Sequence, residues 1–106
     1  MILDVNKDTF ASEVLEATGK VVVDFYGDGC VPCAALMPHI HGFADVYGDK
    51  IKFTALNTTK ARRLAISQKI LGLPVIAIYE NGVIIDSKVK EEATPEAVEE
   101  MIKAHA

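Results

Sequence analysis

Residues 21–33 read VVVDFYGDGCVPC, and the order of features in this stretch decides the fold. The first six residues, Val21–Tyr26, form a continuous β-branched and aromatic run, which is typical of a central strand buried on both faces. One carboxylate, Asp24, interrupts the run. Gly27-Asp28-Gly29 ends the strand, and helical spacing extends from Cys33 to about Tyr47. The sequence therefore predicts a buried strand, a short loop, a cysteine pair and a helix, in that order.

Strand and helix patterns alternate on both sides of this stretch, with no internal repeat and no linker. Strands are predicted at Ile2–Val5, Ile51–Asn57, Val75–Tyr79 and Val83–Val89, and helices at Thr9–Ala17, at Ala61–Lys69 and from Thr94 onward. Asn81-Gly82 predicts a tight type I′ hairpin between the last two strands. The order predicts one α/β domain over residues 1–106. Its mixed central sheet combines parallel strands with a C-terminal antiparallel hairpin and lies between helices on both faces.

The composition is that of an ordinary globular domain. Hydrophobic residues make up 50% of the 106 residues, and a chain of this length buries about 60–65% of the surface that its unfolded form exposes. The net charge of -4 makes nucleic acid a poor partner, and we interpret Lys60, Arg62 and Arg63 as a solvated face. The first residues lack the pattern of a secretory signal, and no stretch approaches the ~20 apolar residues of a membrane span. We therefore expect a cytoplasmic monomer that does not bind membranes.

Cys30 and Cys33 are the only cysteines, and their spacing favours reversible redox chemistry. Residues three apart at a helix start lie on one face with Cβ atoms roughly 5–6 Å apart, close to disulfide geometry. Cys30, at the helix N-terminus, faces free N–H groups and the positive end of the helix dipole, which favour a thiolate. Cys33 lies one turn further on and should be more buried. We therefore expect Cys30 to attack a substrate disulfide and Cys33 to resolve the mixed disulfide.

Resolution requires a base for the Cys33 thiol, and Asp24 is the candidate. A carboxylate in a buried strand, shortly before the loop, can keep a raised pKa and accept that proton directly or through water. The alternative is an Asp24 that is merely exposed at the end of the strand.

A pair of cysteines with two residues between them is also half of a zinc site, so His39 and His41 are candidates for the missing ligands. These histidines are too close together for the usual His-x3–5-His spacing, which makes surface histidines the simpler interpretation. His105, near the C-terminus, is interpreted as a favourable charge at a helix end. We therefore expect no metal and no bound cofactor, only a redox-active disulfide.

A set of motifs, taken in order, resembles the thioredoxin family over nearly the whole chain. The set comprises Val21–Phe25, the cysteine pair, Pro38 five residues after the second cysteine, Leu73-Pro74 and Asn81-Gly82. The resemblance implies the thioredoxin fold and a protein disulfide reductase that receives electrons from an FAD-containing thioredoxin reductase. It also implies that Pro74 follows a cis peptide bond beside the disulfide and that Leu73 offers backbone hydrogen bonds to an extended substrate. From the residues alone, Leu-Pro before a buried strand is only a turn.

The substrate face departs from the common thioredoxin pattern. Gly-Cys-Val-Pro-Cys stands at residues 29–33, where most thioredoxins have Trp-Cys-Gly-Pro-Cys. The loss of the tryptophan removes a flat apolar contact surface. We therefore expect Gly29, Val31 and Pro32 to line an altered substrate surface.

Two further departures concern charge. The lysine that usually lies near the buried aspartate of thioredoxins is replaced by Ala55, which should raise the pKa of Asp24 further. A glycine often found beyond the hairpin is replaced by Lys90. We expect Lys90 to alter docking of the substrate, or else to be an exposed lysine without a role.

The variant site, together with residues 61–74, is similar to the thioredoxins of amino-acid-fermenting anaerobic bacteria that serve glycine reductase. This resemblance implies protein substrates with a disulfide or a selenenylsulfide. Two rival interpretations stay open. One is a glutathione-linked, glutaredoxin-like protein, which fits Asp24 and the Asn81-Gly82 hairpin less well; the other is a non-catalytic binding module that uses the surface of Cys30 and Pro74.

Overall fold

A five-stranded mixed sheet forms the centre of the protein in a computed structural model that describes residues 1–106. The strand order is β1-β3-β2-β4-β5, with parallel pairing among β1, β3 and β2 and antiparallel pairing of β4 with β2 and β5. The strands are β1 (Leu3–Val5), β2 (Lys20–Tyr26), β3 (Lys52–Asn57), β4 (Val75–Glu80) and β5 (Val83–Val89). The mixed sheet with a C-terminal hairpin, predicted from the sequence, is confirmed.

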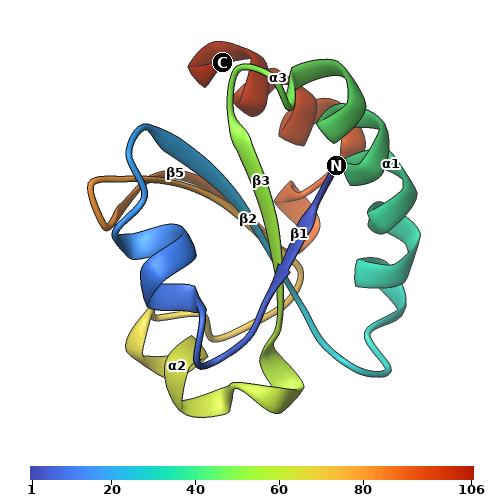
Figure 1. Cartoon of the computed structure of the whole chain (residues 1–106). Helices are drawn as coiled ribbons and strands as arrows, with labels where there is room; N and C mark the ends of the chain where they lie inside the picture. The colour runs from blue at the N-terminus through green and yellow to red at the C-terminus, as the bar shows by residue number, and fades with distance from the viewer.

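Helices cover both faces of the sheet. The three α-helices are α1 (Val31–Tyr47), α2 (Arg62–Ser67) and α3 (Pro95–His105), and the short turns are η1 (Ala11–Leu15), η2 (Thr58–Lys60) and η3 (Lys90–Glu92). Figure 1 shows α1 and α3 on one face, with η1 and α2 on the other. None of these helices combines the length and the hydrophobicity needed to cross a membrane.

The strand β2 divides the core into two layers because its side chains alternate between the faces of the sheet. Val22 packs into the cluster beneath α1 and α3, whereas Val21, Val23 and Phe25 pack into the cluster beneath η1 and α2. By the same alternation, Asp24 shares the face of Val22. The one carboxylate of the strand therefore lies on the side of the sheet that α1 covers.

Two predicted helices are shorter than the sequence pattern indicates. Residues 9–17 contain only the five-residue turn η1, in which the Glu16 N–H donates to the Ala11 carbonyl, the spacing of a π-turn. The helix α2 ends at Ser67 because Lys69 adopts a left-handed conformation with φ of 62°. The Ile70 N–H then donates to the Ala65 carbonyl, which closes the helix end as in a Schellman motif.

Turn and cap residues occupy the places that the sequence indicates. Asn81 and Gly82 have φ of 54° and 80°, the positive values that a type I′ hairpin requires. The Thr94 hydroxyl accepts a hydrogen bond from the Ala97 N–H at 3.1 Å and caps α3. The helix α1 begins at Val31, two residues before the predicted start, because Pro32 fits the first turn of a helix. Pro38 lies inside α1, which continues to Tyr47.

Candidate active site

The loop between β2 and α1 is held by neighbours from the end of β3. The Asp28 N–H donates to the Thr59 hydroxyl at 2.9 Å, and the Asn57 amide donates to the Asp28 carboxylate at 3.0 Å. Gly27 is tightly enclosed, because an added Cβ would be 3.1 Å from the Thr59 hydroxyl and 2.9 Å from the Leu73 side chain. Gly29 has φ of 74°, a conformation that glycine adopts without strain. The loop therefore delivers Cys30 to the start of α1 in a fixed position.

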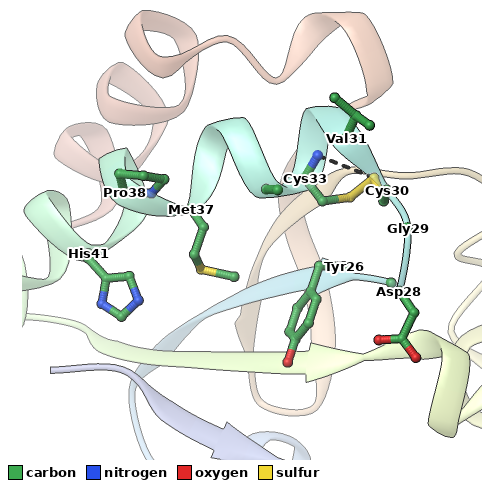
Figure 2. Close-up of a pocket in the computed structure, with 11 residues that line it drawn as sticks. Tyr26, Asp28, Gly29, Cys30, Val31, Cys33, Met37, Pro38 and His41 are labelled. Carbon is green, nitrogen blue, oxygen red and sulfur yellow. Dashed lines mark hydrogen bonds between the residues drawn. A yellow bond between two sulfur atoms is a disulfide. The ribbon is translucent and has the colours of Figure 1, made fainter.

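Cys30 and Cys33 form a disulfide across the first turn of α1, with an S–S distance of 2.11 Å and Cα atoms 5.2 Å apart. Cys30 is the N-cap, and its sulfur accepts a hydrogen bond from the Cys33 N–H at 3.2 Å (Figure 2). Cys30 is partly exposed, whereas Cys33 is only 3% exposed. An incoming sulfur can therefore reach Cys30 more easily than Cys33.

Asp24 is buried in β2 without a positive neighbour. It is 2% exposed, so the alternative of an aspartate exposed at the strand end is wrong. Its partners across the sheet are Ala55 on β3 and Ile76 on β4, both apolar and buried. Desolvation raises the pKa of Asp24 from 3.8 to about 7. The carboxyl group therefore titrates near neutral pH, in the range where a proton acceptor is useful.

The loop before β4 completes this end of the molecule. The peptide bond between Leu73 and Pro74 is cis, and Pro74 is buried. The Pro74 carbonyl accepts a hydrogen bond from the Lys90 N–H at 2.7 Å. Lys90 has φ of 54°, and its side chain lies on Gly72, where an added Cβ would collide with the Lys90 Cε. Pro74, Lys90 and Pro32 line one hollow, so Lys90 lies beside the cysteine-bearing turn.

An open cavity of about 830 Å³ adjoins the disulfide on the side of α1. Its lining includes Tyr26, Met37 and His41 in addition to both cysteines (Figure 2). No atom lies within 4 Å of a Cβ built on Gly29, so residue 29 leaves space that a larger side chain would occupy. Val31 is 77% exposed next to Cys30. The surface around the disulfide is thus open and mainly apolar.

Sequence reasoning missed the helical part of this lining. Ala34, Met37 and His41 follow Cys33 along one face of α1 at helical spacing. The helical spacing of these residues after Cys33 could have indicated that they share its face of the helix. That spacing does not distinguish the wall of a cavity from a packed helix face.

The histidines lie apart from one another and form no metal centre. His41 lines the cavity beside the disulfide, whereas His39 lines the hollow of Pro32 and Pro74. No group of three or more His, Cys, Asp or Glu side chains is placed to hold a metal ion. His105 lies at the end of α3, where its Nε2 is 3.0 Å from the Asp86 carboxylate and its Nδ1 is 3.5 Å from Lys20 Nζ.

The arrangement supports one kind of chemistry. A partly exposed sulfur at a helix N-terminus is bonded to a buried sulfur one turn away, and a helix N-terminus stabilises a thiolate there. Such a pair accepts two electrons when it opens and returns them when it closes, without unfolding of the domain. The site defines the class of dithiol-disulfide redox proteins.

Comparison with known proteins gives the family. Residues 1–104 match the family model described as Thioredoxin. A thioredoxin of Acetoanaerobium sticklandii is 54% identical over 104 residues, which cover 98% of this chain and 99% of that protein. A thioredoxin of Peptoclostridium acidaminophilum is 50% identical over 99% of this chain and 96% of its own length. The chloroplastic M-type thioredoxin of Chlamydomonas reinhardtii is 37% identical over 74% of this chain and 56% of that protein.

The chain belongs to the thioredoxin family. It is a thiol-disulfide oxidoreductase that works without a cofactor, through its redox-active disulfide. The observed fold is therefore the thioredoxin fold, and the family resemblance seen in the sequence is confirmed.

We predict that Asp24→Asn stabilises the oxidised protein in a pH-dependent manner. The folded pKa of about 7 lies above the unfolded value of 3.8, so the folded state binds the proton more tightly, and wild-type stability falls as the pH rises from about 4 to about 7. Asparagine cannot titrate. The gain in free energy of unfolding should therefore grow by roughly 4 kcal/mol between pH 4 and pH 8, at about 1.4 kcal/mol per pKa unit.

Urea unfolding of both proteins across this pH range measures the difference. A gain of the same size at every pH would mean that the Asp24 carboxyl group titrates normally in the folded state.

Proposed function

We propose that the protein is a disulfide reductase in which Cys30 is the nucleophile, Cys33 the resolving thiol and Asp24 the proton acceptor. The observation that carries this proposal is the unequal placement of the two sulfurs. Cys30 caps α1 and is partly exposed, whereas Cys33 lies inside the first turn and is buried. Nucleophile and resolving thiol are thus distinguished by position.

The reductive half-reaction has two steps. The Cys30 thiolate attacks a substrate disulfide, so that a Cys30-substrate bond forms while the substrate S–S bond breaks and one substrate thiolate leaves. The Cys33 thiol then gives its proton to Asp24, and its thiolate attacks Cys30. The Cys30–Cys33 bond forms, the mixed disulfide breaks and the second substrate thiolate leaves. The substrate gains two electrons, and the protein ends in the disulfide state of this structure.

The same proposal assigns the substrate surface. Gly29, Val31 and Pro32 border the reactive sulfur, and Pro74 shares a hollow with Pro32. Because Leu73 precedes the cis bond, its backbone is the group that we assign to pairing with an extended substrate segment. Lys90 borders the same hollow and is assigned to substrate docking.

The electrons come, in this proposal, from an FAD-containing thioredoxin reductase, and the substrates include the selenoprotein system of glycine reductase. Thioredoxins of two amino-acid-fermenting anaerobes are at least half identical to this chain over nearly its full length, which supports the assignment. The Gly-Cys-Val-Pro-Cys site is the sequence feature that led to it. A cytoplasmic location and a monomeric state stay predictions.

We predict that Cys33→Ser accumulates mixed disulfides with an oxidised protein substrate, because attack by Cys30 survives while resolution is lost. Cys30→Ser, the matched control, should accumulate none. Non-reducing gels of the two reduced variants, each mixed with the same substrate, test the assignment. Equal trapping by both variants would contradict the roles given to the two cysteines.

We predict that Asp24→Asn slows resolution by at least about tenfold and leaves the attack step nearly unchanged, since loss of a general base typically costs two or more powers of ten. Stopped-flow measurement of the two substrate thiols released in sequence separates the steps. The wild-type resolution rate should rise with pH around 7, where Asp24 loses its proton. A variant that merely distorts the fold would lower the rate without removing this dependence, and unchanged resolution would exclude Asp24 from the mechanism.

We predict that oxidised protein reoxidises the reduced flavin of an FAD-containing thioredoxin reductase, measured by the return of flavin absorbance. Cys33→Ser should also capture a selenium-containing protein from an extract of an amino-acid-fermenting anaerobe, as measured by selenium in the dithiothreitol-released fraction. Captured proteins without selenium would contradict the glycine reductase assignment, and a flavin that stays reduced would contradict the choice of reductase.

A further inference from the structure

The charges of this chain are strongly segregated along the sequence. Residues 50–79 contain six lysines and arginines and no acidic residue, whereas the rest of the chain contains the other five cations and all fifteen aspartates and glutamates. A protein of net charge -4 thus has one long segment that is purely cationic. Segregation of this kind creates a local potential whose sign is opposite to that of the net charge.

The fold brings part of this segment against the cysteine loop, where Thr59 and Leu73 lie next to Asp28 and Gly27. The turn η2, which contains Lys60, supplies the Thr59 hydroxyl that binds the backbone of Asp28 in the cysteine loop. Arg62 lines a hollow with Leu71 and Gly72, and Lys69 and Lys90 line a second hollow that shares these two residues. Arg62, Lys69 and Lys90 therefore flank the loop that leads into the cis-proline.

We give the name cationic face to the exposed side chains of Lys60, Arg62, Arg63, Lys69 and Lys90. None of them takes part in an ion pair, because the two pairs of the structure join Lys52 to Glu13 and His105 to Asp86. Nothing in the domain neutralises these charges by direct contact. They are free to interact with a partner.

The cationic face also has an apolar centre. Leu71 is 82% exposed and Ile66 is 64% exposed, and both lie in the hollow that Arg62 lines. An apolar centre inside a charged rim is the usual anatomy of a protein-binding surface. Acidic groups also occur here, since Asp28 lies in the cysteine loop that η2 binds, and Glu91 lines a hollow together with Lys90.

We infer that the cationic face docks protein partners that have acidic residues next to their disulfide. The inference rests on the proposed reductase function and adds to it the class of partner. An acidic partner is attracted by the cationic face even though the net charge of the whole chain repels it, so the encounter is directed to the reactive end. A partner with basic residues beside its disulfide is repelled from the same end.

Three synthetic peptides with one intramolecular disulfide each test this inference. They are identical except for a flank of three aspartates, three lysines or three serines. The measured quantity is the second-order rate constant for reduction of each peptide by the reduced protein. At low salt the acidic peptide should react about tenfold faster than the basic one, and in about 0.5 M salt, where the Debye length is about 4 Å, the two rates should converge.

Charge-reversal variants locate the effect. Arg62→Glu with Arg63→Glu should reverse the preference at low salt. The matched control, Lys50→Glu with Lys103→Glu, has the same net charge, but its exposed residues precede β3 and lie near the end of α3, at the other end of the molecule from α2 (Figure 1). The control should keep the wild-type preference, because the inference concerns position and not total charge.

The possible outcomes distinguish a failure of the docking inference from a failure of the proposed reductase function. If the serine peptide were reduced and the acidic and basic peptides reacted at equal rates, the inferred docking role of the cationic face would be overturned, while the reductase function would stand. An equal loss of preference in both charge-reversal variants would also overturn it, since net charge alone would then explain the effect. If the serine peptide were not reduced at all, the proposed function would fail and the inference with it.

Discussion

The pairing of β2 on both of its edges is the constraint on which the site depends. β3 runs parallel to β2 and β4 runs antiparallel to it, so the carboxyl ends of β2 and β3 and the amino end of β4 lie at the same end of the sheet. The cysteine loop, the turn η2 and Pro74, from three distant parts of the chain, all lie at that end. The order and direction of the strands therefore bring the three segments of the site together.

The same burial that fixes β2 sets the chemistry of Asp24. Burial, with apolar partners on both adjacent strands, favours the neutral carboxyl group over the carboxylate. In thioredoxins with a lysine nearby, part of that cost would be offset by a positive charge; here Ala55 offers none. The domain therefore holds a buried carboxyl group at the expense of stability above neutral pH, a cost that is common for functional groups in hydrophobic cores.

Much of the fold and of the site could be predicted from the sequence because the patterns that indicate them lie within short segments. The run Val21–Tyr26 has no polar residue except Asp24, so its burial followed from the pattern, and the hairpin followed from Asn81-Gly82. The cis bond before Pro74 required the family resemblance, since local sequence predicts only a turn there. The helix predicted at 9–17 was too long, because apolar spacing at Phe10 and Val14 is satisfied equally by a five-residue turn that packs on the sheet.

Features that join distant segments could not be predicted in this way. The left-handed backbone of Lys90 follows from its hydrogen bond to the Pro74 carbonyl, sixteen residues earlier in the chain. Its side chain rests on Gly72, a contact that no periodicity encodes. The interpretation of Lys60, Arg62 and Arg63 as a solvated face was correct for their exposure. It lacked their position beside the reactive end of the sheet, which only the topology supplies.

Gly29 and the cationic face favour the same way of recognising a partner. Gly29 leaves open space beside Cys30, so a partner finds less flat apolar surface there for orientation. Charges act over about a Debye length and orient a partner before contact, without requiring close fit at the sulfur. In the proposed docking, a site with an open end and segregated charge selects its partners mainly during the encounter, and the exchange chemistry that follows requires only that the two sulfurs meet.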